Sequence, residues 1–179
     1  MDVMTAIRTR RSVRSYAARP IPADVLERMQ QALRYAPSAC NYQPWRFIMV
    51  TDADLKQKVA QASFDQMWMA AAPVIVVGCG DLTHAYKTMG GRGNSTDIDL
   101  AIALDHLSLA AVAEGLGTCW IGAFDEQRVK ELLDVPTEIK VVAMMPLGYP
   151  ATPDLNFPLD DTQRKPPGDV FHKEHYGEA

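Results

Sequence analysis

Apolar residues recur at intervals of three and four positions in several stretches of the chain, which is the spacing of an amphipathic helix. Asp2 can cap the first of these helices, and Pro37 ends the second, because the residue before a proline avoids the helical conformation. The pattern predicts helices over 3–9, 23–35, 54–62, 97–114 and 126–133.

Short, almost wholly apolar runs alternate with these helices and predict buried strands. They lie at 45–50, 74–78, 119–122 and 141–147. Alternation of helices with short buried strands indicates a mixed α/β or α+β layered fold. A doubly wound nucleotide-binding fold needs a glycine-rich turn directly after its first strand, and no segment here supplies one.

The predicted helix over 97–114 is apolar on more than one face. A helix of this kind must be covered on both sides, and one layer of so small a domain leaves one side open. We therefore expect this helix to be buried partly against a second subunit.

Composition and length fit one ordinary globular domain over residues 1–179, since no linker or repeat divides the chain. The polar, glycine-rich stretch 81–96 predicts a mobile loop. The tail from Ala151 is rich in proline and glycine, so we expect it to wrap around the molecule without forming a core element.

Charge and cysteine content narrow the function classes. The formal net charge of −4 disfavours a nucleic-acid partner. Three widely spaced cysteines without a CxxC pair favour a reducing compartment over a disulfide framework. The start of the chain has no apolar core of a signal peptide, and no run is apolar enough to cross a bilayer, so a cytoplasmic location and no membrane partner are expected.

The sequence contains no convincing metal site. Asp97 and Asp99 lie where acidic residues compensate a helix dipole. Ligand spacing is absent among the histidines, which are His84, His106, His172 and His175. Cys119 has no histidine near it in sequence, so a buried packing thiol is favoured over a nucleophile.

A basic segment near the start of the chain is a candidate phosphate site. Charged and hydroxyl donors of different length can converge on a phosphate monoester. The donors are Arg10, Arg11, Ser12 and Arg14. An isolated segment of this kind can equally be a solvated basic turn.

Residues 37–45 form a polar turn bracketed by prolines, between a helix and a strand. Its short side chains would let a flat ring approach the backbone, and the amides of Asn41 and Gln43 offer donors and acceptors. An ordinary loop that places Trp45 in the core explains the same residues equally well.

The segment 115–122 follows the long helix and carries three glycines, which permit tight backbone geometry and exposed amides. A flavin needs a hydrogen-bond donor near N5 and positive charge near N1 and O2. The backbone at Ile121 and Gly122 can supply the donor, and Arg11 or Arg14 the charge. A helix stop followed by a core strand is the alternative.

Five motifs in this order resemble the nitroreductase family of FMN enzymes across essentially the whole chain. They are RRSVRSY, APSACNYQPWRF, EGLGTCWIGAF, PLGYP and RKPPGDVFH. The resemblance implies an α+β fold, a three-layer α/β/α sandwich with a mainly antiparallel central sheet, in an intertwined homodimer that holds FMN between subunits.

The resemblance also implies cofactor-binding residues. The phosphate and ribityl chain would be held by Arg10, Arg11 and Ser12, with Arg14 near the ring's N1 and O2. The turn would cover a neighbour's flavin with Pro37, Ser38, Ala39 and Asn41, and Gln43 beside them. The ring would meet the backbone of Trp120, Ile121 and Gly122. From the tail, the phosphate would be reached by Arg164 or Lys165, and Gln66 is the candidate contact for N3 and O4.

The activity implied by the resemblance is ping-pong transfer of hydride from NAD(P)H, through flavin N5, to a nitroaromatic, a quinone or another electron-poor acceptor. The cofactor carries this chemistry, so no catalytic side chain is expected. Two alternatives stay open: a narrower flavoenzyme, such as a reductive dehalogenase or a dehydrogenase of cyclic substrates, and a non-catalytic flavin-binding protein. The sequence does not distinguish NADH from NADPH.

Overall fold

A computed structural model describes residues 1–91, 93–152 and 155–178 of the chain. Arg92, within the glycine-rich stretch, and three residues of the tail, 153, 154 and 179, lie outside the described residues. Helices and strands alternate in the order α1 (Val3–Thr9), α2 (Ala23–Arg34), β1 (Trp45–Val50), α3 (Ala53–Ala62), β2 (Val74–Asp81), α4 (Thr96–Ala113), β3 (Gly117–Thr118), α5 (Glu126–Leu133) and β4 (Ile139–Gly148).

The four strands form one antiparallel sheet in the order β1-β2-β4-β3. The long strands β2 and β4 occupy the centre, and every residue of β2 except Asp81 is buried. This confirms the antiparallel sheet that the family resemblance implied. Strands β1 and β3 are the two edges of the sheet.

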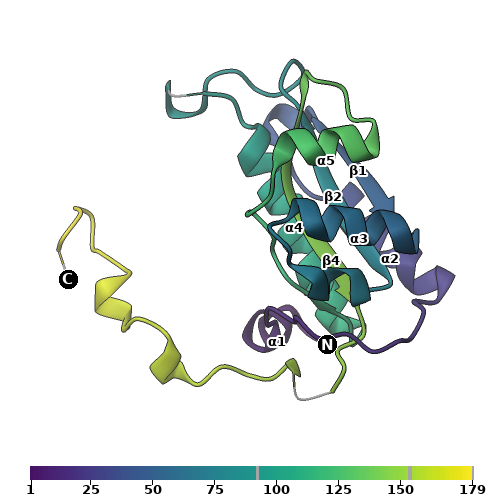
Figure 1. Cartoon of the computed structure of the whole chain (residues 1–179). Coiled ribbons are helices and arrows are strands. Elements are labelled where there is room, and N and C mark those ends of the chain that lie inside the picture. Colours follow the sequence, from purple (N-terminus) through teal and green to yellow (C-terminus); the bar gives the residue numbers. More distant parts are fainter. Residues whose placement is uncertain (92, 153–154, 179) are drawn as a thin grey trace.

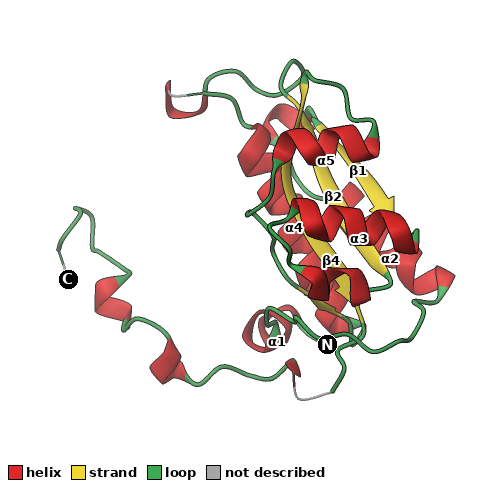
Figure 2. Ribbon diagram, in the orientation of Figure 1, coloured by secondary structure: helices red, strands yellow, loops and turns green. Residues whose placement is uncertain are grey.

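Helices cover both faces of the sheet (Figure 1, Figure 2). On one face α2 and α4 bury Met29, Leu33, Leu100, Leu104 and Leu107 against Val76, Met145 and Leu147. On the other face α3 and α5 bury Val59, Ala60 and Val129 against Ile75, Val77 and Met144. The expected three-layer sandwich is confirmed, with α2 and α4 on one face of the sheet and α3 and α5 on the other.

The strand predicted over 119–122 is shorter in the structure and begins two residues earlier. Gly117 and Thr118 pair with Gly148 and Leu147 at the end of β4. Beyond them, Ile121 makes only an isolated bridge with Met144. The chain therefore leaves the ladder after Thr118 and returns to it once, which leaves Trp120 outside the sheet with 44% of its surface exposed.

Apolar surface remains uncovered around α1 and the long helix α4. The Asp2 carboxylate caps α1 by accepting a hydrogen bond from the Thr5 amide at 3.0 Å, as predicted. Beyond that cap, α1 exposes Val3, Met4 and Ile7, and α4 exposes Ile98. Ile98 belongs to the helix for which the sequence predicts partial burial against a second subunit.

The C-terminal segment leaves the body of the molecule and carries short 3-10 turns at Asp161–Gln163 and Pro167–Asp169 (Figure 1). Every described residue from 160 onward is exposed, Phe171 and Tyr176 included. Within the described chain, no helix combines the length and the apolar character needed to cross a bilayer.

Candidate flavin site

The basic segment lies directly beside the edge strand β3. The Val13 amide donates to the Thr118 carbonyl at 2.9 Å, and Ser12 pairs with Thr118 in a parallel bridge. Gly117 makes this approach possible, because a Cβ atom there would lie 2.6 Å from Cγ2 of Val13. The two segments that the sequence proposed separately are therefore one structural unit.

Three guanidinium groups gather at this unit. Burial lowers the pKa of Arg11, and the positive charges of Arg10 and Arg164 lower it further. The Arg11 side chain donates to the carbonyls of Arg10 and Arg8 and stacks on Phe157, 4.7 Å from the ring centre. Its Nε is buried and has no hydrogen-bond partner among the described residues. A buried donor among like charges is suited to an anion.

Arg164 is the tail residue whose positive charge acts on Arg11, and both Arg164 and its neighbour Lys165 are exposed. Hydrogen bonds hold the tail near this point. The Leu159 amide donates to the Arg8 carbonyl at 3.0 Å, and Asn156 Nδ2 donates to the Leu116 carbonyl at 3.0 Å. The tail therefore crosses the end of α1 before it leaves the body.

Arg14 faces a different part of the same unit. Its guanidinium lies 6.0 Å from the ring centre of Trp68. Burial raises the pKa of the Cys119 thiol, and Arg14, the Ser12 hydroxyl and Arg10 each lower it by less. The positive charge of Arg14 therefore acts on Cys119, the residue between β3 and Trp120.

Of the two backbone amides predicted as donors to flavin N5, those of Ile121 and Gly122, one is already hydrogen-bonded within the chain. The Ile121 amide donates to the Met144 carbonyl at 2.9 Å and is therefore occupied. Gly122 is exposed, and its amide forms no hydrogen bond within the described part of the chain. Of the two candidate donors for flavin N5, the structure leaves Gly122 available.

Gln66 lies beside this segment. Its side-chain amide donates to the carbonyls of Ser63 at 2.9 Å and Ala123 at 3.2 Å. Both of its N–H groups are used in this way, so the side-chain oxygen is the atom left to face a ring.

The turn over 37–43 has a strained but well-connected backbone. Cys40, Asn41 and Gln43 all have positive φ, near 51°, 55° and 51°. A left-handed conformation costs roughly 1–2 kcal/mol for a residue other than glycine. The Gln43 amide donates to Ser38 Oγ at 2.9 Å, and Gln43 Nε2 donates to Asn41 at 3.2 Å. Pro37, Asn41 and Gln43 are exposed, which leaves their outer surface free.

The turn and the arginine group do not meet within one chain. The turn leads into β1, whereas the arginines lie beside β3, and these strands are opposite edges of the sheet. Three strand spacings separate the edges, roughly 14 Å. The Ala39 amide binds Asp99 near the start of α4, while Gly117 follows the end of α4, roughly 20 Å away along the helix. One chain therefore presents two separate half-sites: the turn 37–43, which leads into β1, and the arginine group beside β3.

Comparison with known proteins decides the family. The model described as "Nitroreductase family" matches residues 7–79 and 65–149. The chain belongs to the nitroreductase family. A protein of Archaeoglobus fulgidus, provisionally named NADH dehydrogenase/NAD(P)H nitroreductase, is 36% identical over 89% of this chain and 92% of its own.

Two further relatives of this nitroreductase-family chain cover nearly its whole length. A Bacillus subtilis protein named FMN reductase (NAD(P)H) is 30% identical over 98% of this chain and 74% of its own. The solved structure of a nitroreductase family protein from Clostridium novyi NT is 30% identical, with a TM-score of 0.79, covering 100% of this chain and 97% of that one.

Sequence reasoning within the nitroreductase family missed three residues that the structure places at the half-sites. Trp68 lies beside Arg14, Phe157 lies beneath Arg11, and buried Asp99 holds the turn. An aromatic residue before a proline was the only signal for Phe157. The sequence alone assigns Asp99 to the helix dipole, because its partner in the turn is sixty positions away in the sequence.

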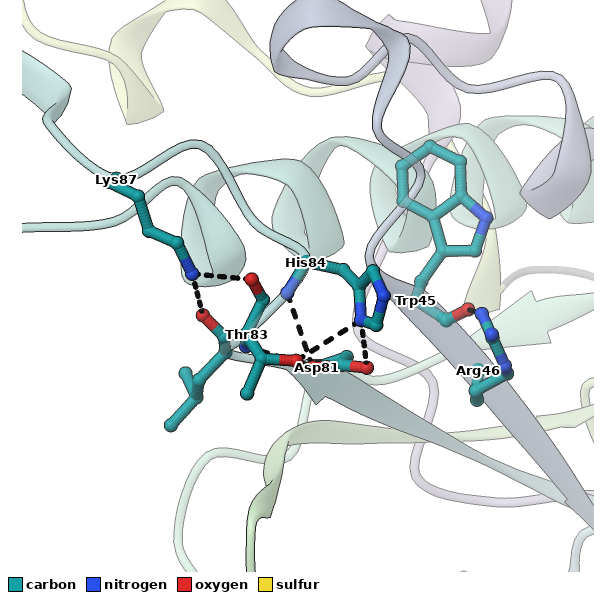
Figure 3. Close-up of polar contacts among 7 residues, drawn as sticks. Trp45, Arg46, Asp81, Thr83, His84 and Lys87 are labelled. Carbon is teal, nitrogen blue, oxygen red and sulfur yellow. Dashed lines mark hydrogen bonds and ion pairs between the residues drawn. The ribbon is translucent and has the colours of Figure 1, made fainter.

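The stretch after β2 is folded by its own polar contacts (Figure 3). The Asp81 carboxylate accepts hydrogen bonds from the Thr83 amide at 2.8 Å and from the His84 ring at 2.6 Å. Lys87 Nζ donates to the carbonyls of Leu82 and Thr83. Against this loop, Tyr42 of the turn closes a hollow of about 500 Å³. The described residues include no cluster of three or more potential metal ligands.

Proposed function

We infer that the chain is an NAD(P)H-dependent oxidoreductase with FMN as its cofactor. Membership of the nitroreductase family supports this conclusion, as do the NAD(P)H and FMN in the names of its relatives. The residues of the two half-sites are suited to such a cofactor, which needs a phosphate site, a donor near N5 and positive charge near N1.

The FMN phosphate is proposed to bind where Arg10, Arg11, Ser12 and Arg164 gather, with Lys165 beside them. The single observation that carries this assignment is the buried Nε of Arg11, which has no partner among the described residues although like charges surround it. Phosphate oxygens would accept from that Nε and offset the repulsion between the guanidiniums.

The flavin ring is proposed to lie along the 120–122 segment, with the Gly122 amide toward N5 and Trp120 at the margin. Arg14 would place positive charge beside the N1 and O2 edge, and Gln66 would offer its oxygen to the N3 side. Bound FMN supplies the hydride acceptor and donor of the reaction. The chain contributes position and charge, and no side chain is required to transfer a proton in the hydride step.

The second half-site is proposed to come from another copy of the chain, in a homodimer. The turn with Pro37, Ser38, Ala39, Asn41 and Gln43 would cover the partner's flavin and exclude water from it. Two observations support the dimer: the half-sites lie on opposite sheet edges, and apolar side chains of α1, α4 and the tail are exposed.

The overall reaction is proposed to be ping-pong. NAD(P)H would deliver hydride and leave, and a nitroaromatic, a quinone or a similar electron-poor acceptor would then take its place. One position beside the ring would serve both reactants in turn.

The test is to load the purified protein with FMN, dialyse it and record its absorbance spectrum and its mass by size exclusion. We expect about one FMN per subunit in a dimer, and steady NAD(P)H oxidation with a panel of acceptors. A colourless dialysed protein would refute the function. Retained flavin without NAD(P)H turnover would instead support a non-catalytic binding protein, and turnover with one narrow substrate class a specialised flavoenzyme.

A further inference from the structure

A buried carboxylate connects the turn to the core of the molecule. Asp99 lies in the first part of α4 and is only 2% exposed. One of its oxygens accepts a hydrogen bond from the Ala39 amide at 2.9 Å, and the other accepts one from Ser95 Oγ at 2.7 Å. Ser95 is fully buried.

The same pair also holds the loop after β2. The Ser95 amide donates to the Tyr86 carbonyl at 2.9 Å, and Ser95 Oγ accepts from the Tyr86 amide at 3.1 Å. Tyr86 and Tyr42 line the hollow of about 500 Å³ between the loop and the turn. Two side chains thus fix both walls of one hollow.

Compensation of the helix dipole does not account for this arrangement. Asp97 lies in the same first turn of α4, where it is exposed and pairs with Lys140 at 2.7 Å. A solvated carboxylate of that kind serves the dipole without burial, whereas burying a second one costs free energy unless its hydrogen bonds are needed. Ser95 occupies the N-cap position but makes no capping hydrogen bond, because its hydroxyl is directed to Asp99.

The strain of the turn explains why an anchor is needed. Three left-handed residues other than glycine within four positions persist only where their surroundings fix them. Inside the turn, the Asn41 amide donates to the Ser38 carbonyl at 3.0 Å and the Tyr42 amide to the Ala39 carbonyl at 3.1 Å. The bond from Ala39 to Asp99 is the one that ties this local network to the helix.

We propose that Asp99 and Ser95 are positioning residues: Asp99 holds the turn 37–43 in the conformation that meets the partner's flavin, and Ser95 couples that turn to the loop 83–88. The inference rests on the proposed function for its flavin, but its structural part concerns the chain alone. Substrate that enters the hollow between Tyr42 and Tyr86 would therefore contact both the turn and the loop, which the Asp99–Ser95 pair holds in place.

The first experiment compares Asp99→Asn with Asp97→Asn, which removes the same charge from the same helix turn. Hydrogen–deuterium exchange of apoprotein should rise about tenfold or more over residues 38–43 in Asp99→Asn and stay unchanged in Asp97→Asn. In loaded protein, Asp99→Asn should weaken FMN binding about tenfold and change the visible circular dichroism of the bound flavin.

The second experiment uses Ser95→Ala, which leaves the bond between Asp99 and Ala39 in place. Exchange should rise over residues 83–88, and KM for the acceptor should increase severalfold while kcat and FMN affinity change little. Unchanged exchange over 83–88 would overturn the coupling, and this variant tests it even if Asp99→Asn does not fold.

The outcomes separate the two proposals. A wild-type protein that fails to retain FMN would refute the proposed function, yet the exchange measurements on apoprotein would still test the anchor. Wild-type exchange and FMN affinity in Asp99→Asn would overturn the positioning role while leaving the proposed function intact.

Discussion

The side chain of Arg11 is fixed before any ligand arrives. Two backbone carbonyls accept from its terminal nitrogens, and the ring of Phe157 supports its plane. Ordering an arginine side chain costs up to about 2 kcal/mol of rotamer entropy, which a prearranged side chain has lost already on folding. The residue therefore offers its remaining Nε to an anion at little further entropic cost.

Arg14 is expected to act on the energy of the reduced flavin. If Arg14 lies beside the N1 and O2 edge as proposed, replacing it with Ala removes positive charge where reduction adds negative charge. We expect the two-electron reduction potential of bound FMN to fall by roughly 30 mV, equivalent to about 1.4 kcal/mol. Spectroscopic titration against a reference dye measures this reduction potential.

Arg19→Ala is the matched control for this prediction, because Arg19 stacks on Tyr149, 3.8 Å from the ring centre, outside the candidate flavin site. The reduction potential of FMN bound to Arg19→Ala should equal that of FMN bound to the wild-type protein. Equal potentials in Arg14→Ala and the wild type would show that Arg14 does not lie near the ring.

Tyr16 gives a prediction about stability and pH. Its buried hydroxyl donates to the Val13 carbonyl at 2.7 Å, and burial raises its pKa above the ordinary value. The unfolded chain therefore loses the phenol proton near pH 10 and the folded chain only at higher pH, so the contribution of Tyr16 is complete below pH 10 and is lost above it.

Tyr16→Phe should lower the free energy of unfolding by about 1 kcal/mol at pH 7, because the Val13 carbonyl loses a donor. The difference from wild type should shrink as the pH rises above about 10. Urea unfolding at pH 7, 9 and 10.5 measures both effects. A difference that grows with pH would contradict the assignment.

Among the elements, β3 is the shortest strand and the one on which the proposed phosphate half-site depends. It pairs with β4 on one side and with the segment 12–13 on the other. The strand is two residues long, so its position is set by what packs against it and by the glycine that admits Val13.

Gly117→Ala is expected to displace the basic segment. The new methyl group would lie 2.6 Å from Cγ2 and 2.8 Å from Cβ of Val13, and Val13 is buried. We expect a loss of about 1–3 kcal/mol in stability from overpacking, and weaker FMN binding. Calorimetry and flavin titration test both parts.

Gly168→Ala is the control, since no atom lies within 4 Å of a Cβ atom at that position. It should match wild type in both measurements. Wild-type FMN affinity in Gly117→Ala would mean that the basic segment does not depend on close packing against β3.

At this scale the sequence predicted most of the fold. Bounds of α2, β1, α3 and α5 agree with the predicted ranges to within one residue, because a clear apolar period or a buried run defines each. The strand at 119–122 was misplaced because the apolar residues there alternate between the core and the surface, so composition gave no register. The candidate site residues came from motifs, whereas Asp99 and Trp68 required the tertiary contacts.

For the whole molecule, the decisive feature is that the two half-sites lie on opposite sheet edges. In a two-fold symmetric dimer each copy gives one half-site and receives the other, so two complete sites form together. This arrangement makes a defect in either half-site repairable by a partner with the other half intact.

Complementation between two variants tests this sharing. Arg10→Glu should abolish FMN retention through the phosphate half-site, and Ala39→Trp should abolish it through the turn. Co-expressed copies that pair at random should recover roughly a quarter of the wild-type flavin content, since half of the dimers are mixed and each mixed dimer has one intact site.

A mixture that stays colourless while size exclusion shows mixed dimers would place both half-sites in the same chain. The control is a mixture of Arg10→Glu with Arg11→Glu, which share one half-site and should recover no flavin.

The separation of the half-sites by the width of the sheet has a consequence for the cell. In the proposed dimer, cofactor binding and subunit association would be thermodynamically linked, because each would favour the same complete state. Scarce flavin would shift the population toward single chains, and dilution of the protein would release flavin. Specific activity per subunit would then depend on the protein concentration. A modest fall in expression would therefore lower the total activity by a larger fraction than it lowers the amount of protein.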